Sequence, residues 1–145
     1  MATTHHDLPR HECIALLESD SVGRLCIVDH GYPLAFPVNY RVVHDAAGDR
    51  IVFRTSPTAS MAGYEGLSSL EVDSISADRQ QAWSVIVRGR LHRPHGDADL
   101  PDTHPLITAG RYQWLVLDVS SISGRRFHGK PAADRFSVDW QTIDA

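Results

Sequence analysis

The chain has 145 residues, of which 42% are hydrophobic and 22% charged, and its formal net charge is −4 at pH 7. This length and composition predict one globular domain that can bury a core without a disulfide or a structural metal. The acidic balance argues against a general nucleic-acid-binding protein, and no apolar run approaches the ~18 residues of a membrane span.

The first half of the chain predicts a short helix followed by three strands. Residues 9–19 place apolar side chains at the i, i+3, i+4 spacing of an amphipathic helix. Turn-forming residues then separate the apolar segments at two places, residues 30–33 and 45–49. We expect strands over residues 22–28, 34–43 and 50–55.

The second half predicts three more strands. Residues 56–66 are small and polar and predict one helical turn, whereas residues 92–110 contain three prolines and predict a long loop. Residues 123–126 are expected to leave the last strand. The three expected strands span residues 67–75, 82–91 and 112–122.

Six strands joined mostly by short turns predict a mainly β fold with few short helices, arranged as a closed or partly closed antiparallel barrel. We expect one domain over residues 1–145, with a core at about 8–127 and a C-terminal tail over 128–145. Residues 1–7 have no apolar segment and therefore do not resemble a signal peptide. A cytoplasmic protein is the resulting expectation, with neither nucleic acid nor membrane as a partner.

The second expected strand contains the segment Pro37-Val38-Asn39-Tyr40. Proline cannot donate to a strand ladder, so this strand is an edge or is bulged at that point. The backbone groups left open there suit the polar edge of a flavin ring, and the amide of Asn39 adds donors and an acceptor. The alternative is a bulged edge strand with no ligand.

The third expected strand ends in Arg54-Thr55-Ser56-Pro57, and Ser60 follows where the helical turn is expected to begin. A guanidinium group, hydroxyls and a helix N-terminus together suit a phosphate. The alternative is a turn in which the hydroxyls cap the helix and the arginine is solvated.

The fifth expected strand begins with Trp83 and Ser84, and Trp83 is either a core residue or a ligand contact. Arg88 and Arg90 alternate away from its apolar face. They form either a solvated barrel surface or a cationic wall at a groove between subunits. We predict no metal site, because the two cysteines lack zinc-ligand spacing and the HxxH pair His92 and His95 is weak as a signal.

In their order and spacing these segments resemble the pyridoxamine 5'-phosphate oxidase-like, FMN-binding split-barrel family, in particular its small bacterial branch, over residues 8–127. The resemblance implies a six-stranded antiparallel Greek-key split barrel that forms a homodimer, with FMN in a groove between the subunits. It also implies an oxidoreductase that acts on a small-molecule substrate. The matching segments include 22–25, 37–40, 52–57, 70–73, 83–90 and 124–126.

The same resemblance implies a set of cofactor-binding residues, with no side chain assigned a catalytic role. The strand at residues 37–40 would lie along the flavin ring, and Trp83 and Ser84 would contact the flavin region from a neighbouring strand. Arg54 and Thr55, at the end of a third strand, would face the ribityl chain and phosphate, and residues 56–60 would close on the phosphate. An arginine near the end of the barrel, Arg125 or Arg126, would reach the site across the dimer. The residues are Pro37, Val38, Asn39, Tyr40, Arg54, Thr55, Ser56, Ser60, Trp83, Ser84 and Arg125.

One departure from the family pattern opens alternatives. Members commonly carry a lysine or arginine in the phosphate turn, where this chain has Ala59-Ser60-Met61. A missing cation weakens phosphate binding unless Arg54 compensates. The alternatives are an F420 (deazaflavin)-dependent reductase, whose acidic tail would meet Arg88, Arg90, Arg125 and Arg126, or a non-catalytic barrel that has lost its cofactor or binds haem through His92, His95 or His128.

Overall fold

A computed structural model describes residues 4–56, 59–76, 78–95, 100–101, 103 and 112–129. The described chain forms seven strands, one α-helix and one 3₁₀ turn. In chain order they are β1 (Thr4–Asp7), α1 (Arg10–Glu18), β2 (Val22–Asp29), β3 (Tyr32–Asp45), β4 (Gly48–Thr55), η1 (Ser60–Gly63), β5 (Gly66–Ser76), β6 (Gln81–His92) and β7 (Gln113–His128).

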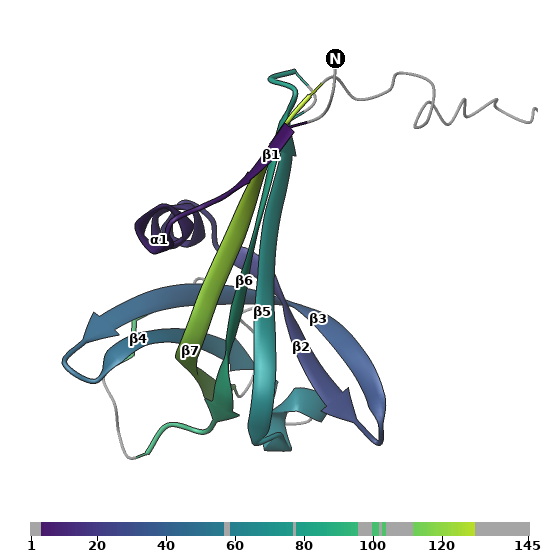
Figure 1. Ribbon diagram of the computed structural model, residues 1–145. Helices are drawn as coiled ribbons and strands as arrows, with labels where there is room; N and C mark the ends of the chain where they lie inside the picture. The colour runs from purple at the N-terminus through teal and green to yellow at the C-terminus, as the bar shows by residue number, and fades with distance from the viewer. Residues whose placement is uncertain are drawn as a thin grey trace, which may run out of the picture.

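Six of the strands close into a barrel whose neighbours are all antiparallel. The sheet order is β1-β7-β4-β3-β2-β5-β6, and β6 also pairs with β7, which closes the ring. β5 returns to lie beside β2, so the spatial order 5-2-3-4 is that of a Greek key. Figure 1 shows β3 as one long arch, with β4 along one half and β2 beside the other. The predicted six-stranded Greek-key barrel is therefore confirmed.

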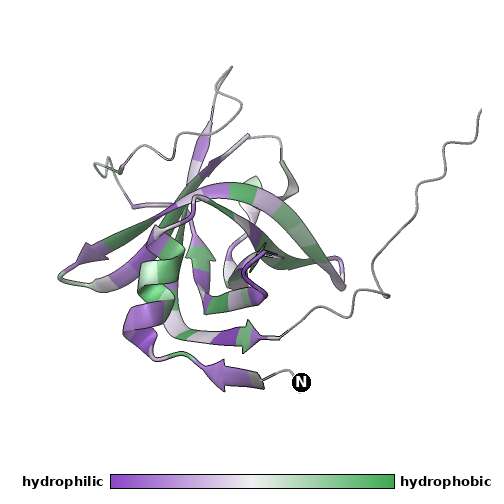
Figure 2. Cartoon of the chain, turned by 90° about the horizontal axis from the view of Figure 1, so that it is seen from above, coloured by the Kyte–Doolittle hydropathy of each residue, from purple (hydrophilic) through white to green (hydrophobic). Residues whose placement is uncertain are grey.

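The strand count differs from the prediction because of β1, which pairs with the end of β7 from Thr4 opposite His128 to Asp7 opposite Arg125. β7 also continues six residues past the expected end at Ile122. The prediction that residues 123–126 leave the strand is wrong. The β1 sequence Thr-His-His-Asp has no apolar alternation, and Figure 2 shows a largely hydrophilic strand.

The core consists of the inward side chains of the barrel strands and one face of α1. Along β6, the inward side chains alternate strictly with the outward ones, as a strand with one buried face requires. Each fully buried large apolar side chain contributes about 1.5–3 kcal/mol relative to exposure. The fully buried strand residues include Leu25, Tyr40, Phe53, Leu70, Val72, Val85, Val87, Leu91, Leu115 and Leu117.

Two glycines allow close approaches that shape the barrel. The β6–β7 register shifts between Arg88 and Gly89, and a Cβ atom at Gly89 would lie 1.9 Å from the carbonyl oxygen of Asp118. At Gly124 a Cβ atom would lie 2.7 Å from the Sγ of Cys13 on α1. The first glycine therefore permits the bulge, and the second lets α1 pack directly on β7.

In the part of the chain that the structure describes, no helix has the length and apolar character needed to cross a membrane.

Candidate functional site

β3 changes its partner strand in the middle of the segment singled out by the sequence. Asn39 is the last β3 residue paired with β2, opposite Val22, and Tyr40 is the first paired with β4, opposite Phe53. Over residues 37–39, no described strand pairs with the edge of β3 that faces away from β2. This edge of β3 is therefore not covered by a neighbouring strand of the described chain.

β4 continues past the point where β3 leaves it. Its last residues, Arg54 and Thr55, pair only with β7, opposite Trp114 and Gln113. The two strands thus diverge, and we call the space between Pro37–Asn39 of β3 and the segment 54–56 at the end of β4 the fork. Because side chains alternate along a strand, Arg54 lies on the face opposite the core residue Phe53.

The chain turns sharply after the fork. Ser56 is exposed, and its carbonyl oxygen accepts a 3.0 Å hydrogen bond from the backbone N–H of Ala59. η1 begins at Ser60, so the single helical turn expected here is confirmed. The structure therefore brings two of the predicted segments together at one place, the edge of β3 and the end of β4 that leads toward η1.

Two of the predicted site residues have their side chains in the core. Val38 is buried, and Tyr40 is fully buried with its hydroxyl donating a 2.6 Å hydrogen bond to the carbonyl oxygen of Leu17. Burial raises the pKa of the Tyr40 hydroxyl well above its usual range. Val38 therefore offers its backbone and not its side chain to the fork, and Tyr40 lies where the fork begins. That these residues bind a cofactor stays a prediction.

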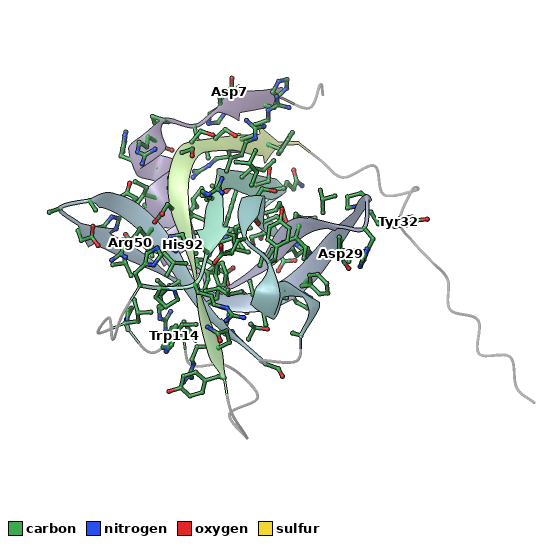
Figure 3. All side chains as sticks on the ribbon, turned by 90° about the horizontal axis from the view of Figure 1, so that it is seen from below. Asp7, Asp29, Tyr32, Arg50, His92 and Trp114 are labelled. Atoms are coloured by element: carbon green, nitrogen blue, oxygen red, sulfur yellow. The ribbon has the colours of Figure 1, made fainter. Side chains whose placement is uncertain are left out.

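The other predicted residues form a second group at the far end of the barrel. Ser84 lies opposite Arg125, and Trp83 lies opposite Arg126, in the β6–β7 ladder. Arg125 is eleven positions beyond Trp114 on β7, which is about 35 Å along an extended strand. Figure 3 shows Trp114 at one end of the molecule and Asp7, the β1 partner of Arg125, at the other. One chain by itself therefore does not join this group to the fork.

The two arginines at the end of β7 lie near carboxylates, whereas the two arginines on β6 are exposed. The Nε atom of Arg125 lies 3.6 Å from an Asp7 carboxylate oxygen, and an Nη atom of Arg126 lies 4.0 Å from Glu12. Arg88 and Arg90 are exposed on β6, and Arg88 has serines as its cross-strand partners on both sides.

The histidines considered as haem ligands have other contacts. The Nε2 atom of His92 lies 2.7 Å from an Asp118 carboxylate oxygen, and its Nδ1 atom lies 2.7 Å from the carbonyl oxygen of Arg93. Both ring nitrogens of His92 are thus at hydrogen-bond distance from an oxygen of this chain. The ring of His95 stacks on His92 at 5.4 Å, and that of His128 stacks on His6 at 5.5 Å. Among the described residues, no group of three metal-ligating side chains converges.

Two aromatic residues that the sequence did not indicate lie on the β7 side of Arg54, next to the fork. The guanidinium carbon of Arg54 lies 4.5 Å from the ring centre of Tyr112 and 5.5 Å from that of Trp114. Only the β4–β7 register reveals this proximity, because more than fifty residues separate these aromatics from Arg54 in the chain.

Comparisons with known proteins agree with this architecture. The family model for pyridoxamine 5'-phosphate oxidase matches residues 9–126. The FAD binding protein from Mycobacterium smegmatis is 25% identical with a TM-score of 0.67, over 86% of this chain and 100% of that chain. A conserved protein of unknown function from Corynebacterium diphtheriae is 26% identical with a TM-score of 0.73, over 85% of this chain and 98% of that chain.

The FAD and heme binding protein from Mycobacterium smegmatis, 18% identical with a TM-score of 0.66 over 86% of this chain and 75% of that chain, shares the fold. No curated protein matches the chain in sequence. The family match includes α1, the whole barrel ring and the fork, and the strand order is the one that the resemblance implied. The chain belongs to the pyridoxamine 5'-phosphate oxidase family.

Proposed function

We propose that this protein binds a flavin at the fork, with FMN as the cofactor, and acts as an oxidoreductase on a small molecule. The observation that carries the proposal is the divergence of β3 and β4, which places an open strand edge next to Arg54, Thr55 and Ser56. An isoalloxazine ring needs backbone donors and acceptors along one edge, and its phosphate needs a cation and hydroxyls. The similarity to a FAD binding protein at 25% identity supports a flavin.

Each residue of the fork has a role in this proposal. The backbone of Pro37–Asn39 and the amide of Asn39 would orient the ring. Arg54, Thr55 and Ser56 would hold the phosphate, and the turn that leads into η1 would enclose it. When bound, the flavin supplies the electron-transfer chemistry, and the protein supplies binding and orientation. The core side chain of Tyr40 fixes the backbone beside the ring.

A homodimer is part of the same proposal. Several large apolar side chains are exposed on the outer strands, among them Leu67 at 75%, Ile75 at 77% and Ile86 at 37%. All three side chains point outward from β5 and β6, where Ser69, Glu71 and Asp73 lie between the two β5 residues. Exposed large apolar side chains on a sheet face are typical of an interaction surface. A second copy packed against this face would cover them. It would also allow the partner's Trp83, Ser84 and Arg125 to approach the fork, which they do not reach within one chain.

Absorption spectroscopy tests the proposal directly. Purified protein would be titrated separately with FMN, FAD, F420 and haem, and bound cofactor would be measured after gel filtration. Retention of FMN at about one molecule per chain, lost in an Arg54→Glu variant but not in an Arg79→Glu variant on the β5–β6 turn, is the expected result. Failure to retain either flavin would overturn the proposal.

F420 is the second candidate, because Arg88 and Arg90 are exposed on one face of β6 and no described residue forms an ion pair with Arg88. The acidic tail of F420 would meet these side chains. Charge reversal at both positions is then expected to abolish F420 binding and to leave FMN binding unchanged. Unchanged F420 affinity would remove this candidate. The contacts of His92 give haem no comparable support.

A further inference from the structure

Arg54 lies against two aromatic rings at the open end of the β4–β7 ladder. Its guanidinium carbon is 4.5 Å from the Tyr112 ring centre and 5.5 Å from the Trp114 ring centre. Both distances lie within the ~6 Å over which a cation is attracted to an aromatic face. The two rings meet edge to face, with centres 6.0 Å apart and planes at 90°. The arginine is thus held by a pair of rings that also contact each other.

The strand register explains why these three residues meet. Arg54 and Trp114 are direct cross-strand partners, and Tyr112, the residue just before β7, also places its ring against Arg54 on the same face of the ladder. On that face the next pair along the ladder, Val52 and Val116, is fully buried. Tyr112 is 55% exposed. The arrangement is therefore rigid at its inner end and reaches the surface at its outer end.

A guanidinium group can stack and bind an anion at the same time. Its planar faces contact aromatic rings, whereas its N–H donors lie in the plane and point outward in a fork that matches phosphate oxygens. Stacking restricts the side chain and so lowers the entropy that is lost when an anion binds. The turn after β4, Ala59-Ser60-Met61, carries no cationic side chain. The position of the Arg54 guanidinium is therefore more important here than in a site with two cations.

We propose that Tyr112 and Trp114 form an aromatic seat that positions Arg54 to bind the terminal phosphate of the flavin. This inference rests on the proposed function, that the fork binds FMN. Tyr112 and Trp114 are positioning residues in this scheme, because they act on the ligand through Arg54. The seat offsets the missing cation of the turn by holding the remaining guanidinium in a productive orientation.

The test compares FMN with riboflavin, which has the same ring and ribityl chain but no phosphate. The ratio of the riboflavin Kd to the FMN Kd, measured on the full chain by quenching of flavin fluorescence at fixed ionic strength, isolates the phosphate contact. Arg54→Gln is expected to lower this ratio about tenfold or more, since a charge-assisted hydrogen bond is lost. Tyr112→Leu is expected to lower it roughly twofold to fivefold, the usual worth of an exposed cation–π contact.

Matched controls separate positioning from folding. Tyr112→Phe keeps the ring and is expected to retain the wild-type ratio, and the riboflavin Kd should be unchanged in every variant. Trp114→Leu, if folded by circular dichroism, should behave as Tyr112→Leu does. A ratio that falls in Arg54→Gln but not in Tyr112→Leu would overturn the seat and leave FMN binding intact. An equal loss of FMN and riboflavin affinity in Tyr112→Leu would also overturn it. Wild-type protein that binds neither flavin would instead overturn the proposed function, and the seat with it.

Discussion

The hydroxyl of Tyr40 donates a 2.6 Å hydrogen bond to the main-chain carbonyl oxygen of Leu17, in the last turn of α1. The carbonyl groups of the last turn of a helix have no partner within the regular helix, and the Leu17 oxygen otherwise accepts only a long 3.4 Å hydrogen bond from the backbone N–H of Asp20 among the described residues. Tyr40 is also the residue at which β3 changes from β2 to β4. This bond therefore ties the helix to the strand at the point where the fork begins.

Tyr40→Phe is expected to destabilise the protein by about 0.5–1.5 kcal/mol, because it removes the donor and leaves a buried carbonyl group less well satisfied. Urea unfolding followed by circular dichroism measures this change. Tyr32→Phe is the matched control, since Tyr32 is exposed at the β2–β3 hairpin and its hydroxyl should contribute little. Equal stability of the two variants would contradict the role assigned to the Tyr40 hydroxyl.

Gly89→Ala tests the bulge in β6. The added Cβ atom would lie 1.9 Å from a backbone oxygen of β7, so the two strands must move apart. We expect a loss of about 1–3 kcal/mol or more, the usual cost of overpacking a filled interior. Gly63→Ala in η1 meets no atom within 4 Å and is expected to be close to neutral. Thermal unfolding of both variants checks the prediction, which fails if Gly89→Ala has the same Tm as the wild type.

The barrel strands were predictable because their inward side chains alternate with polar ones, as along β6 from Trp83 to Leu91. β1 was not, because Thr4–Asp7 is polar throughout and is held only by pairing with β7. The end of β7 was missed for a related reason: the segment Ser123-Gly124-Arg125-Arg126 is small or charged on both faces. Strand pairing and, at Gly124, the packing of α1 keep these segments extended, and no apolar alternation in their sequence indicates it.

The candidate site was predictable only as a set of segments. The alternation along residues 34–43 places Tyr40 on the apolar face of its strand, but the sequence could not show that its hydroxyl meets the carbonyl oxygen of Leu17. Nor could it show that Arg54 faces Trp114, which depends on the register of two strands far apart in the chain. The separation of Ser84 and Arg125 from the fork likewise depends on the length of β7.

The proposed dimer predicts that a charge on the outer face of β6 separates the subunits. Ile86 lies outward between Glu71 and Ser123 and is 37% exposed. Ile86→Glu is expected to convert a dimer into a folded monomer, because it would bury a carboxylate opposite Glu71, with which it cannot pair. Sedimentation velocity measures the mass, with Ile86→Val as the control that keeps an apolar side chain. Wild-type protein that sediments as a monomer at high concentration would rule out the dimer.

A cluster of charged side chains joins α1 to the β3–β4 hairpin through His44. The Nδ1 atom of His44 lies 2.7 Å from an Asp49 carboxylate oxygen, and its Nε2 atom lies 2.7 Å from Glu18 on α1. Arg10, also on α1, reaches the other Asp49 oxygen at 2.6 Å. Hydrogen bonds to Asp49 and Glu18 raise the pKa of His44, and those from His44 and Arg10 lower the pKa of Asp49.

These shifts predict how the stability of the protein depends on pH. The stabilisation by His44 is complete below its unfolded pKa of about 6.5 and is lost as the pH rises through its higher folded value. The stabilisation by Asp49 is complete above its unfolded pKa of about 3.8 and is lost as the pH falls through its lower folded value. The cluster should therefore contribute most between these two unfolded values. The contribution of the cluster to stability is small, at most a few degrees in Tm, because solvent and salt screen these surface charges.

His44→Gln removes the titrating group and is the variant that tests this dependence. The difference in Tm between wild type and His44→Gln is expected to be larger near pH 5.5 than near pH 9, and to shrink when salt is added. His11→Gln is the control, because His11 is exposed on the same helix and no described residue forms an ion pair with it. A difference that stays constant with pH, or that grows toward alkaline pH, would show that His44 contributes by packing and not by its charge.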